Sequence, residues 1–512
     1  MTVMNYLYIG IFLLSFALQT GAQIKHDYVW VFGSRSDDPD SKWGTNFMDF
    51  NNNELTLTKE VMNMHFFVTN ASISDSKGKL LFYTNGCFIH NAFHQLMENG
   101  DNLNPGIAYL TGNCPNGGNA VADGAIILPL PGDSTKYYLF HSNAVQGVSG
   151  VFSIYTGKLN YTLVDMSLNN GLGAVVEKNQ LVIEDTLSGE LHAVRHVNGQ
   201  DWWIVAIRGH ENKYMKVLFT EQGITSVTGQ KIGMDPDPWS SQGGQAKFSP
   251  DGTKFARYTK RDQVFLMDFD RETGELSNFK YLYADSSVIW GGVSFSPNSR
   301  YLYVNTRLKL WQFDTEAPDV QESKVLIDEY DGYLYNGHPS FPTTFYLMQL
   351  APDCKIYMVS RNSTDVLHVI HNPDEAGQAC NFRQHDLQLA AVTPSSIPNF
   401  PNYRLGTPYP VCDSTIQLVT GSVAVLPPAG EVRVWPNPAT GSVSVELSLP
   451  LAGGGEWWLH TAAGQAVRQV WLPPGETLQA VPLSGLAPGL YFWSLRSGEG
   501  RLVGRGKLVV GR

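Results

Sequence analysis

The stretch that decides the fold of this chain is FSPDGTKFA, residues 248–256. An apolar segment ends at Phe248, a Ser-Pro-Asp-Gly turn follows with proline at its second position, and alternating polar and apolar residues then resume. The pattern recurs as FSPNSRYLYV at 295–304 and as LAPDCKIYMV at 350–359, so the copies start 47 and 55 residues apart. A hairpin that recurs at intervals of roughly 40–50 residues predicts the blades of a β-propeller.

Weaker copies of the same hairpin lie upstream, at residues 73–85, 125–142 and 191–207. Each has turn residues between two apolar runs, which is the signal for a β-hairpin. These copies bring the count to six. The stretch YVWVF at 28–32 and the region near Tyr403 would complete a seventh by joining the two ends of the ring. We expect an all-β propeller of seven blades, with six as the alternative.

The composition changes near residue 430. From Gly430 onward the chain has no aspartate, Asn437 is its single asparagine, and five glutamates face seven basic residues. About seven short alternating strands separated by Gly and Pro turns predict a small immunoglobulin-like β-sandwich there. We therefore expect a propeller at 23–412, a linker at 413–430 that contains Pro427 and Pro428, and a second domain at 431–512.

The N-terminus has the pattern of an export signal. Residues 6–18 (YLYIGIFLLSFAL) are apolar but too few to span a bilayer, which takes about 20 residues. Small residues at Thr20 and Ala22 precede an expected cut before Gln23, which predicts a signal peptide at 1–22. No Lys or Arg precedes the apolar run, in contrast to most signal peptides, and the alternative is a buried N-terminal segment. No later segment is long and apolar enough to predict a transmembrane helix.

The C-terminal domain resembles the type A sorting domain of the type IX secretion system of Bacteroidota. The resemblance rests on VWPNPA at 434–439, AAGQAV at 462–467, LSGLAPGLY at 483–491 and GKLVV at 506–510. It implies passage into the periplasm, export by the type IX machinery as a partner, and an extracellular or outer-membrane-surface location. The residues it marks as the sorting signal are Pro436, Asn437, Pro438, Gly464, Gly489, Tyr491 and Lys507.

The larger domain is similar to a group of propellers that are often attached to such tails. The similar stretches are LLFYTNG at 80–86, MENGD at 97–101, LNYTLVDMSLNN at 159–170 and IPNFPNYRLG at 397–406. The group resembles WD-repeat propellers in architecture, and the resemblance implies fold and location without an activity.

Charge and cysteine content limit the partners. The net charge is −11 and no run of Lys or Arg is present, so we expect no nucleic-acid partner. Export permits disulfides, and the odd number of cysteines, five, leaves at least one without a partner in the chain. Cys87 and Cys114 flank one long loop and are the candidate disulfide pair. The alternative is that all five cysteines are small buried hydrophobic residues.

No catalytic or cofactor motif stands out. His90 and His94 have the spacing of two zinc ligands on a helix, but their context is strand and loop, and no acidic residue lies between them. The Ser-Pro-Asp-Gly stretch at 249–252 is interpreted as a turn rather than as the Asp-box of sialidases. The carboxylates at 37–40 and 235–237 are the candidates for a calcium site. We predict no catalytic, metal or cofactor residue otherwise.

These observations favour a secreted or cell-surface propeller that acts as a non-enzymatic module for adhesion or for binding a glycan or a protein. One alternative is an enzyme that cleaves polysaccharide or peptide. Another is a structural component of a surface or motility assembly.

Overall fold

A computed structural model describes most of the chain. The described residues are 24–36, 38, 41–60, 62–106, 114, 117–146, 154–209, 211–236, 244–259, 263–286, 290–418, 432–447, 450–451, 453–461, 465–498 and 502–511. The predicted signal peptide lies outside these residues, and so do Asp37, Asp40, Asp237 and Gly464.

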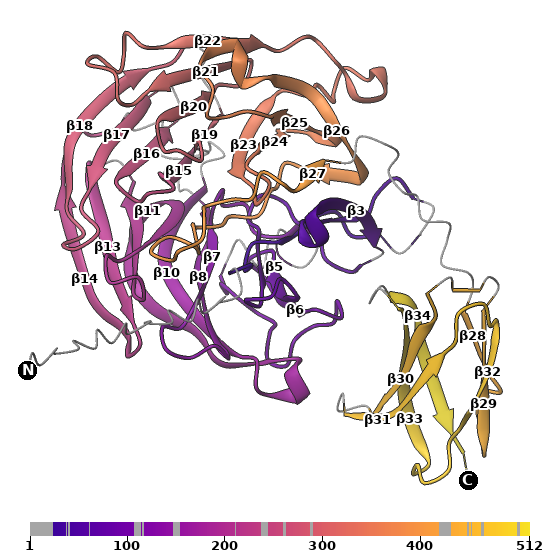
Figure 1. Ribbon diagram of the computed structural model, residues 1–512. Helices are drawn as coiled ribbons and strands as arrows, with labels where there is room; N and C mark the ends of the chain where they lie inside the picture. Colours follow the sequence, from indigo (N-terminus) through magenta and orange to yellow (C-terminus); the bar gives the residue numbers. More distant parts are fainter. Residues whose placement is uncertain are drawn as a thin grey trace, which may run out of the picture.

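Within residues 29–418 the described chain forms mainly antiparallel sheets set around a common axis, which Figure 1 views end-on. Three sheets of four strands are consecutive in sequence. They are β15 (Gln245–Phe248), β16 (Lys254–Thr259), β17 (Gln263–Phe269) and β18 (Leu276–Tyr283); β19 (Gly292–Phe295), β20 (Tyr301–Asn305), β21 (Lys309–Asp314) and β22 (Val325–Glu329); and β23 (Phe345–Leu350), β24 (Ile356–Ser360), β25 (Ser363–Ile370) and β26 (Phe382–Pro394).

The N-terminal half contributes three more sheets. They contain β1 (Val29–Gly33), β2 (Thr45–Asp49) and β3 (Glu54–Glu60); β4 (Ala71–Ser74), β5 (Leu80–Thr84) and β6 (Ile89–Asn91); and β7 (Ala125–Pro129), β8 (Lys136–Ser142), β9 (Val145–Gln146), β10 (Ile154–Asp165), β11 (Ala174–Arg195), β12 (Trp202–Arg208), β13 (Lys213–Thr220) and β14 (Gly223–Lys231). Short 3₁₀ turns lie at Asn51–Asn53, Asn169–Gly171, Tyr335–Gly337 and Gly377–Cys380.

The three repeat copies form the hairpins β15–β16, β19–β20 and β23–β24, as their sequences predict. In the first turn the Ser249 hydroxyl donates to Asp251 Oδ1 over 2.5 Å and accepts the Lys254 N–H over 2.9 Å. Gly252 has a φ of +73°, a left-handed conformation that glycine adopts freely. Side-chain hydrogen bonds and one left-handed residue therefore fix the turn.

β11 is long because it serves two neighbouring units. Its first half pairs with β10 and its second half with β12, and Leu187 takes part in both ladders. A shift of register between Leu187 and Leu191 lets the strand turn from one unit into the next. Strands β7, β8, β10 and the first half of β11 therefore form one unit, and the rest of β11 with β12–β14 forms another.

The two ends of the propeller chain close the ring. The Asn46 side chain in β2 exchanges two hydrogen bonds, of 2.9 and 2.8 Å, with the backbone of Ala391 in β26. The rings of Trp30 in β1 and Phe400 lie 5.8 Å apart. These contacts agree with the expectation that the stretch at 28–32 and the region near Tyr403 meet.

The propeller extends further than residue 412, where the sequence interpretation ended it. Strand β27 (Gln417–Leu418) pairs in parallel with β3, and Cys412 and Ile416 are buried. Residues 417–418, which belong to the range 413–430 expected as linker, thus form the outer edge strand of the ring. Residues 419–431 lie outside the described part of the chain.

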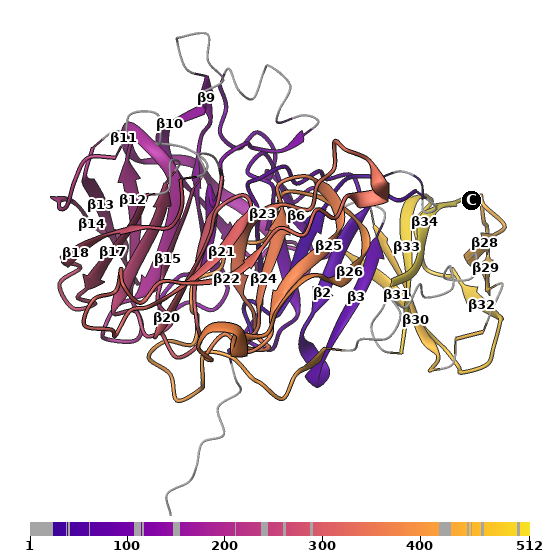
Figure 2. The ribbon, with the colours of Figure 1, turned by 90° about the horizontal axis from the view of Figure 1, so that it is seen from above.

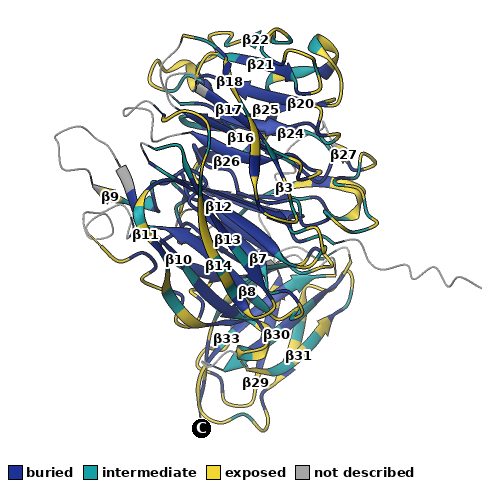
Figure 3. Ribbon diagram, turned by 90° about the vertical axis from the view of Figure 1, so that its left-hand side faces the viewer, coloured by how far each residue is buried: buried dark blue, intermediate teal, exposed yellow. Residues whose placement is uncertain are grey.

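Burial follows the strands, as Figure 3 shows, with exposed residues gathered in turns and outer strands. Trp30 and Trp202 are fully buried in the largest apolar cluster, which also contains Tyr403. Among the described residues, no helix is long and apolar enough to cross a membrane.

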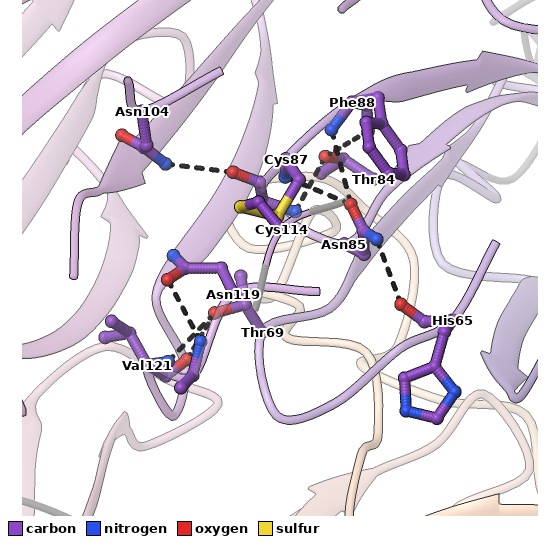
Figure 4. The surroundings of a disulfide bond; sticks show 12 residues. His65, Thr69, Thr84, Asn85, Cys87, Phe88, Asn104, Cys114, Asn119 and Val121 are labelled. Atoms are coloured by element: carbon purple, nitrogen blue, oxygen red, sulfur yellow. Dashed lines mark hydrogen bonds between the residues drawn. A yellow bond between two sulfur atoms is a disulfide. The ribbon is translucent and has the colours of Figure 1, made fainter. Parts of the chain in front are cut away.

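Two disulfides lie in the propeller. Cys87 and Cys114 are bonded, and Figure 4 shows asparagines around them. The Asn85 carboxamide accepts the Cys87 N–H over 3.0 Å, and Asn104 donates to the Gly86 carbonyl over 3.0 Å. A second bridge, which the sequence interpretation did not anticipate, joins Cys354 to Cys412, and Cys380 is a buried free thiol.

The C-terminal residues fold into two facing sheets around one apolar core that contains Trp457 and Leu459. One sheet contains β28 (Val432–Trp435), β29 (Ser442–Leu447) and β32 (Leu478–Pro482), and the other contains β30 (Gly455–Thr461), β31 (Ala466–Leu472), β33 (Gly489–Ser497) and β34 (Leu502–Val510).

The sandwich lies beside the N-terminal sheets of the propeller (Figure 1, Figure 2). Arg505 of β34 donates to the Phe93 carbonyl over 3.1 Å, and the Arg496 guanidinium lies 4.7 Å from the centre of the Phe93 ring. Phe93 is therefore a point of contact between the two domains.

Candidate functional site

The inner strands β15, β19 and β23 finish at one cavity on the propeller axis. Phe248, Phe295 and Leu350, at or next to their last positions, all line it. Its polar lining comes from Asp27, His192, Lys247, Ser294, Gln349, Asn402 and Arg404. We call this end of the axis the finishing end, and the opposite end, where the same strands begin, the starting end.

Lys247 is the buried cation at the base of the cavity. Its ammonium donates to Asn399 Oδ1 over 2.8 Å and to Gln349 Oε1 over 3.0 Å, and Asp123 Oδ2 lies 3.5 Å away. Burial lowers the pKa of Lys247, while the Asp123 charge raises it. Burial also raises the pKa of Asp123. The three donors of the ammonium thus face three acceptors of the protein.

His192 is held as a neutral ring. Its Nδ1 accepts the Phe248 N–H over 3.2 Å, so its Nε2 is the atom that donates to the Phe400 carbonyl, over 3.3 Å. Burial holds the pKa of His192 well below its usual value. Because both ring nitrogens are engaged, this histidine has no free position from which to accept a proton from a ligand.

Asp27 and Arg404 form a buried bidentate pair at the finishing end. The two hydrogen bonds from the guanidinium to the carboxylate measure 2.6 and 2.7 Å. Arg404 also donates to the carbonyls of Ile24 and Val411, over 3.1 and 2.7 Å. The pair therefore joins the first described residues of the propeller to its last turns, and neither charge is left free.

An axial segment, residues 395–404, packs against the inner strands. The Asn399 side chain donates to the carbonyls of Ala125 and Leu191, over 3.2 and 2.9 Å, and its backbone N–H donates to Asn70 over 3.1 Å. The Tyr403 hydroxyl donates to the Ile127 carbonyl over 2.6 Å. One asparagine thus joins three units of the ring, which gives a physical role to part of the stretch 397–406.

At the starting end a second buried pair faces the axis. Arg257 Nη2 and Glu190 Oε2 lie 3.8 Å apart, too far for a hydrogen bond, and both side chains are at most 2% exposed. Burial raises the pKa of Glu190, and the Arg257 charge lowers it.

Glycines let the chains crowd together at the starting end. A Cβ atom on Gly244 would lie 1.8 Å from the Tyr258 carbonyl oxygen, and one on Gly291 would lie 2.1 Å from that of Asn305. Glycine is therefore required at these two positions, where backbones approach each other closely near the axis.

The residues considered for metal binding lie apart from the axis. His94 contacts Glu60 at 3.3 Å and the Tyr83 hydroxyl at 3.1 Å, whereas burial lowers the pKa of His90 to about 4. Asp235 accepts the backbone N–H of Asn212 over 2.8 Å. In the part of the chain that the structure describes, no three His, Cys, Asp or Glu side chains gather as metal ligands. A calcium site at 37–40 or 235–237 stays a prediction, because Asp37, Asp40 and Asp237 are not described.

The described residues of the predicted sorting signal lie on or beside the last two strands of the sandwich. Asn437, between Pro436 and Pro438, donates to the Lys507 carbonyl over 2.8 Å and accepts the Val509 N–H over 2.9 Å. Gly489 begins β33, and the Tyr491 hydroxyl donates to the Ala487 carbonyl over 2.7 Å. These residues therefore fasten the start of the domain to its final strand and fix the corner before β33.

Comparisons with solved structures return proteins of low similarity to this chain. A periplasmic gluconolactonase of Pseudomonas aeruginosa is 12% identical, with a TM-score of 0.43, over 72% of this chain and 98% of that one. The Dos1 propeller is 12% identical, with a TM-score of 0.40, over 73% and 87%. A protein from Lactobacillus plantarum has the same identity and TM-score, over 73% and 99%. These similarities support no inference about activity, and no curated protein matches the chain.

Residues 433–510 match the family described as "Secretion system C-terminal sorting domain". The matched range begins one residue into β28 and ends with the last residue of β34, so the match covers the sandwich. The chain thus carries a type IX sorting domain behind an all-β domain with propeller-like structural neighbours, and it is exported to the cell surface or the extracellular space.

Proposed function

We propose that this protein is a non-enzymatic binding module, displayed at the surface or secreted, whose propeller recognises an extracellular glycan or protein. The type IX machinery exports it through the C-terminal domain. The source is a bacterium of the Bacteroidota, the sorting domain is of type A, and residues 1–22 are a signal peptide that is removed.

The observation that carries the proposal is the pairing of ionisable groups in the axial cavity. Asp27 is held by Arg404, Lys247 faces three acceptors, and both nitrogens of His192 are engaged. General acid–base or nucleophilic catalysis needs a group that is free to exchange a proton with the substrate. In the described cavity each of these groups serves the fold, which favours recognition over chemistry.

The architecture proposed for this module is a seven-bladed ring followed by an immunoglobulin-like sandwich. Its support is the double use of β11, which divides the longest sheet into two units. With the sheets that begin at β1, β4, β15, β19 and β23, these two units give seven among the described residues. Strand β27 adds the outer edge of the first unit and closes the ring.

The alternative is an enzyme that cleaves polysaccharide or peptide and uses Asp123 and Glu190. Both carboxylates are buried near the axis, and burial raises both pKa values, as is common for a general acid.

The two functions are separated by screening the purified chain against polysaccharides and surface proteins, with binding read by surface plasmon resonance and products by mass spectrometry. The binding module predicts saturable binding with the ligand recovered at its original mass. Catalytic release of defined fragments would contradict the proposal and favour the enzyme.

A further inference from the structure

Six of the buried side-chain atoms that lack a hydrogen-bond partner lie at the starting end of the axis. Among the described residues these atoms include Asp123 Oδ2 and Glu190 Oε2, whose charged neighbours Lys247 and Arg257 lie 3.5 and 3.8 Å away, beyond hydrogen-bond distance. They also include the side-chain Oδ1 of Asn305, the Thr344 hydroxyl, and Nε and Nη2 of Arg257. We call these five residues the mouth cluster. All five are at most 2% exposed. By contrast, each described polar side chain that lines the finishing-end cavity has its buried atoms hydrogen-bonded.

The topology brings the mouth cluster together. Asp123 lies just before β7, and Thr344 directly precedes β23. Glu190 directly precedes Leu191, from which β11 pairs continuously with β12. Arg257 and Asn305 lie on second strands, opposite Ala246 and Gly292 at the starts of β15 and β19. Because β15, β19 and β23 finish together at the cavity, their starts meet at the other end.

Electrostatics and packing support this proximity. The pKa of Tyr346 is raised to about 12, chiefly by burial; Arg361 lowers it, and the charges of Asp123 and Glu190 contribute to the rise. Tyr346 also accepts a hydrogen bond of 2.5 Å from the Asn305 side chain through its carbonyl. Three members of the cluster, each from a different unit of the ring, therefore interact with one tyrosine on a fourth unit.

Buried polar groups in proteins are almost always hydrogen-bonded, and groups that lack a protein partner are satisfied by ordered water or by a ligand. The mouth cluster offers donors on Arg257 and acceptors on Asp123, Glu190 and Asn305. An anion would be attracted by Arg257 but repelled by the two carboxylates. A cation would be attracted by the carboxylates but repelled by Arg257. Hydroxyl groups donate and accept at once, so a neutral polyol satisfies both kinds of atom.

An aromatic wall lies beside these groups. Trp290 is half-buried and directly precedes the Gly291–Gly292 pair at the start of β19. The Arg361 guanidinium lies 4.7 Å from the Trp290 ring and 5.1 Å from that of Tyr346. Ligand sites commonly combine apolar or aromatic walls with a few convergent polar groups, and this is the combination found here.

We infer that the mouth cluster binds a neutral polyhydroxylated ligand, a sugar residue of an extracellular glycan. The inference rests on the proposed binding function and assigns it to one end of the axis. Glu190 and Asp123 accept hydrogen bonds from sugar hydroxyls, Arg257 donates to them, and Trp290 packs against the ring.

The test uses the full chain on an array of neutral oligosaccharides, followed by calorimetric titration of the strongest binder. Glu190→Gln, Arg257→Gln and Thr344→Val each remove one contact, and we expect affinity to fall at least tenfold for the first two and several-fold for the third. Arg300→Gln is the matched control, because Arg300 is an exposed arginine paired with Asp314 at 2.7 Å on β21.

Thr344→Val keeps the inference testable if the charge variants unfold. The Thr344 hydroxyl has no protein partner, so its replacement by a methyl group leaves the melting temperature unchanged while weakening the sugar complex. Sugar binding that is unaffected by Thr344→Val, and by whichever charge variants fold, would overturn the site and leave the binding function standing. Binding to proteins without binding to any neutral oligosaccharide would overturn the ligand class. Cleavage of the sugar would instead overturn the proposed function.

Discussion

Cys354 and Cys412 form a disulfide that spans 58 residues and ties the turn of the third repeat to the end of the propeller chain. The Asp413 N–H donates to the Pro352 carbonyl over 2.7 Å at the same place. Between the two cysteines the chain builds β24 to β26 and the axial segment. The bridge therefore fastens the element that crosses the axis to the last unit of the ring.

Replacement of both cysteines by serine should lower the free energy of unfolding of the propeller by about 4 kcal/mol, the chain-entropy value for a loop of this length. Urea unfolding of the wild type and the double variant, both without reductant, measures the difference. Equal midpoints for the two proteins would show that the bridge contributes nothing to stability.

The buried pair of Asp27 and Arg404 gives a second prediction. Asp27→Asn leaves the guanidinium buried without its counter-charge, and such changes cost roughly 3–5 kcal/mol. Asp27→Leu with Arg404→Met removes both charges and should recover part of that loss. Thermal unfolding of the single and double variants tests this order, and a double variant less stable than Asp27→Asn would contradict it.

Acid should destabilise the propeller through its buried neutral histidines. Burial lowers the pKa of His141 to about 3, and the ring is hydrogen-bonded to Asn104 at 2.7 Å and to Thr162 at 2.9 Å. The unfolded chain takes up a proton near pH 6.5 and the folded one does not, so stability rises with pH between about 3 and 6.5 and is flat above.

One such histidine should account for roughly 2–3 kcal/mol of the stability lost between pH 7 and pH 4.5. His141→Gln should reduce that loss, whatever its effect at pH 7. Unfolding free energies of both proteins at the two pH values provide the check. The explanation fails if the variant loses as much stability on acidification as the wild type.

The sorting domain should depend on Asn437. Asn437→Ala removes the hydrogen bonds to the Lys507 carbonyl and the Val509 N–H, which are exposed to solvent, and should cost the sandwich about 0.5–1.5 kcal/mol. Asn437→Asp keeps the acceptor for Val509 and should have an intermediate effect. Calorimetry of the full chain should show the sandwich transition shifted and the propeller transition unchanged. A shift of the propeller transition alone would contradict this role.

The sequence could predict those parts of the fold that depend on neighbours in the chain. Ser249 and Asp251 lie two residues apart, so their turn is visible in the sequence, and the repeat then indicates a ring. The Cys354–Cys412 bridge was missed because its geometry exists only once the ring has closed.

The axial residues were missed for the same reason. Asp123 and Glu190 come from two units, and Lys247 and Arg257 come from neighbouring strands of a third, with no common spacing. Charged residues are usually assigned to a solvent-facing side. The local feature that marks where the chains approach the axis is a glycine directly before each inner strand, Gly244 before β15 and Gly291 before β19.

The central claim is that a sorting domain carries a propeller out of the cell, and deletion tests it most directly. A chain that ends at residue 430 keeps every described strand of the propeller. Its location in the native host is read by fractionation and surface labelling, beside the full chain. The account predicts that the full chain reaches the surface or the medium and that the shortened chain stays folded in the periplasm. A shortened chain that still reaches the surface would contradict it.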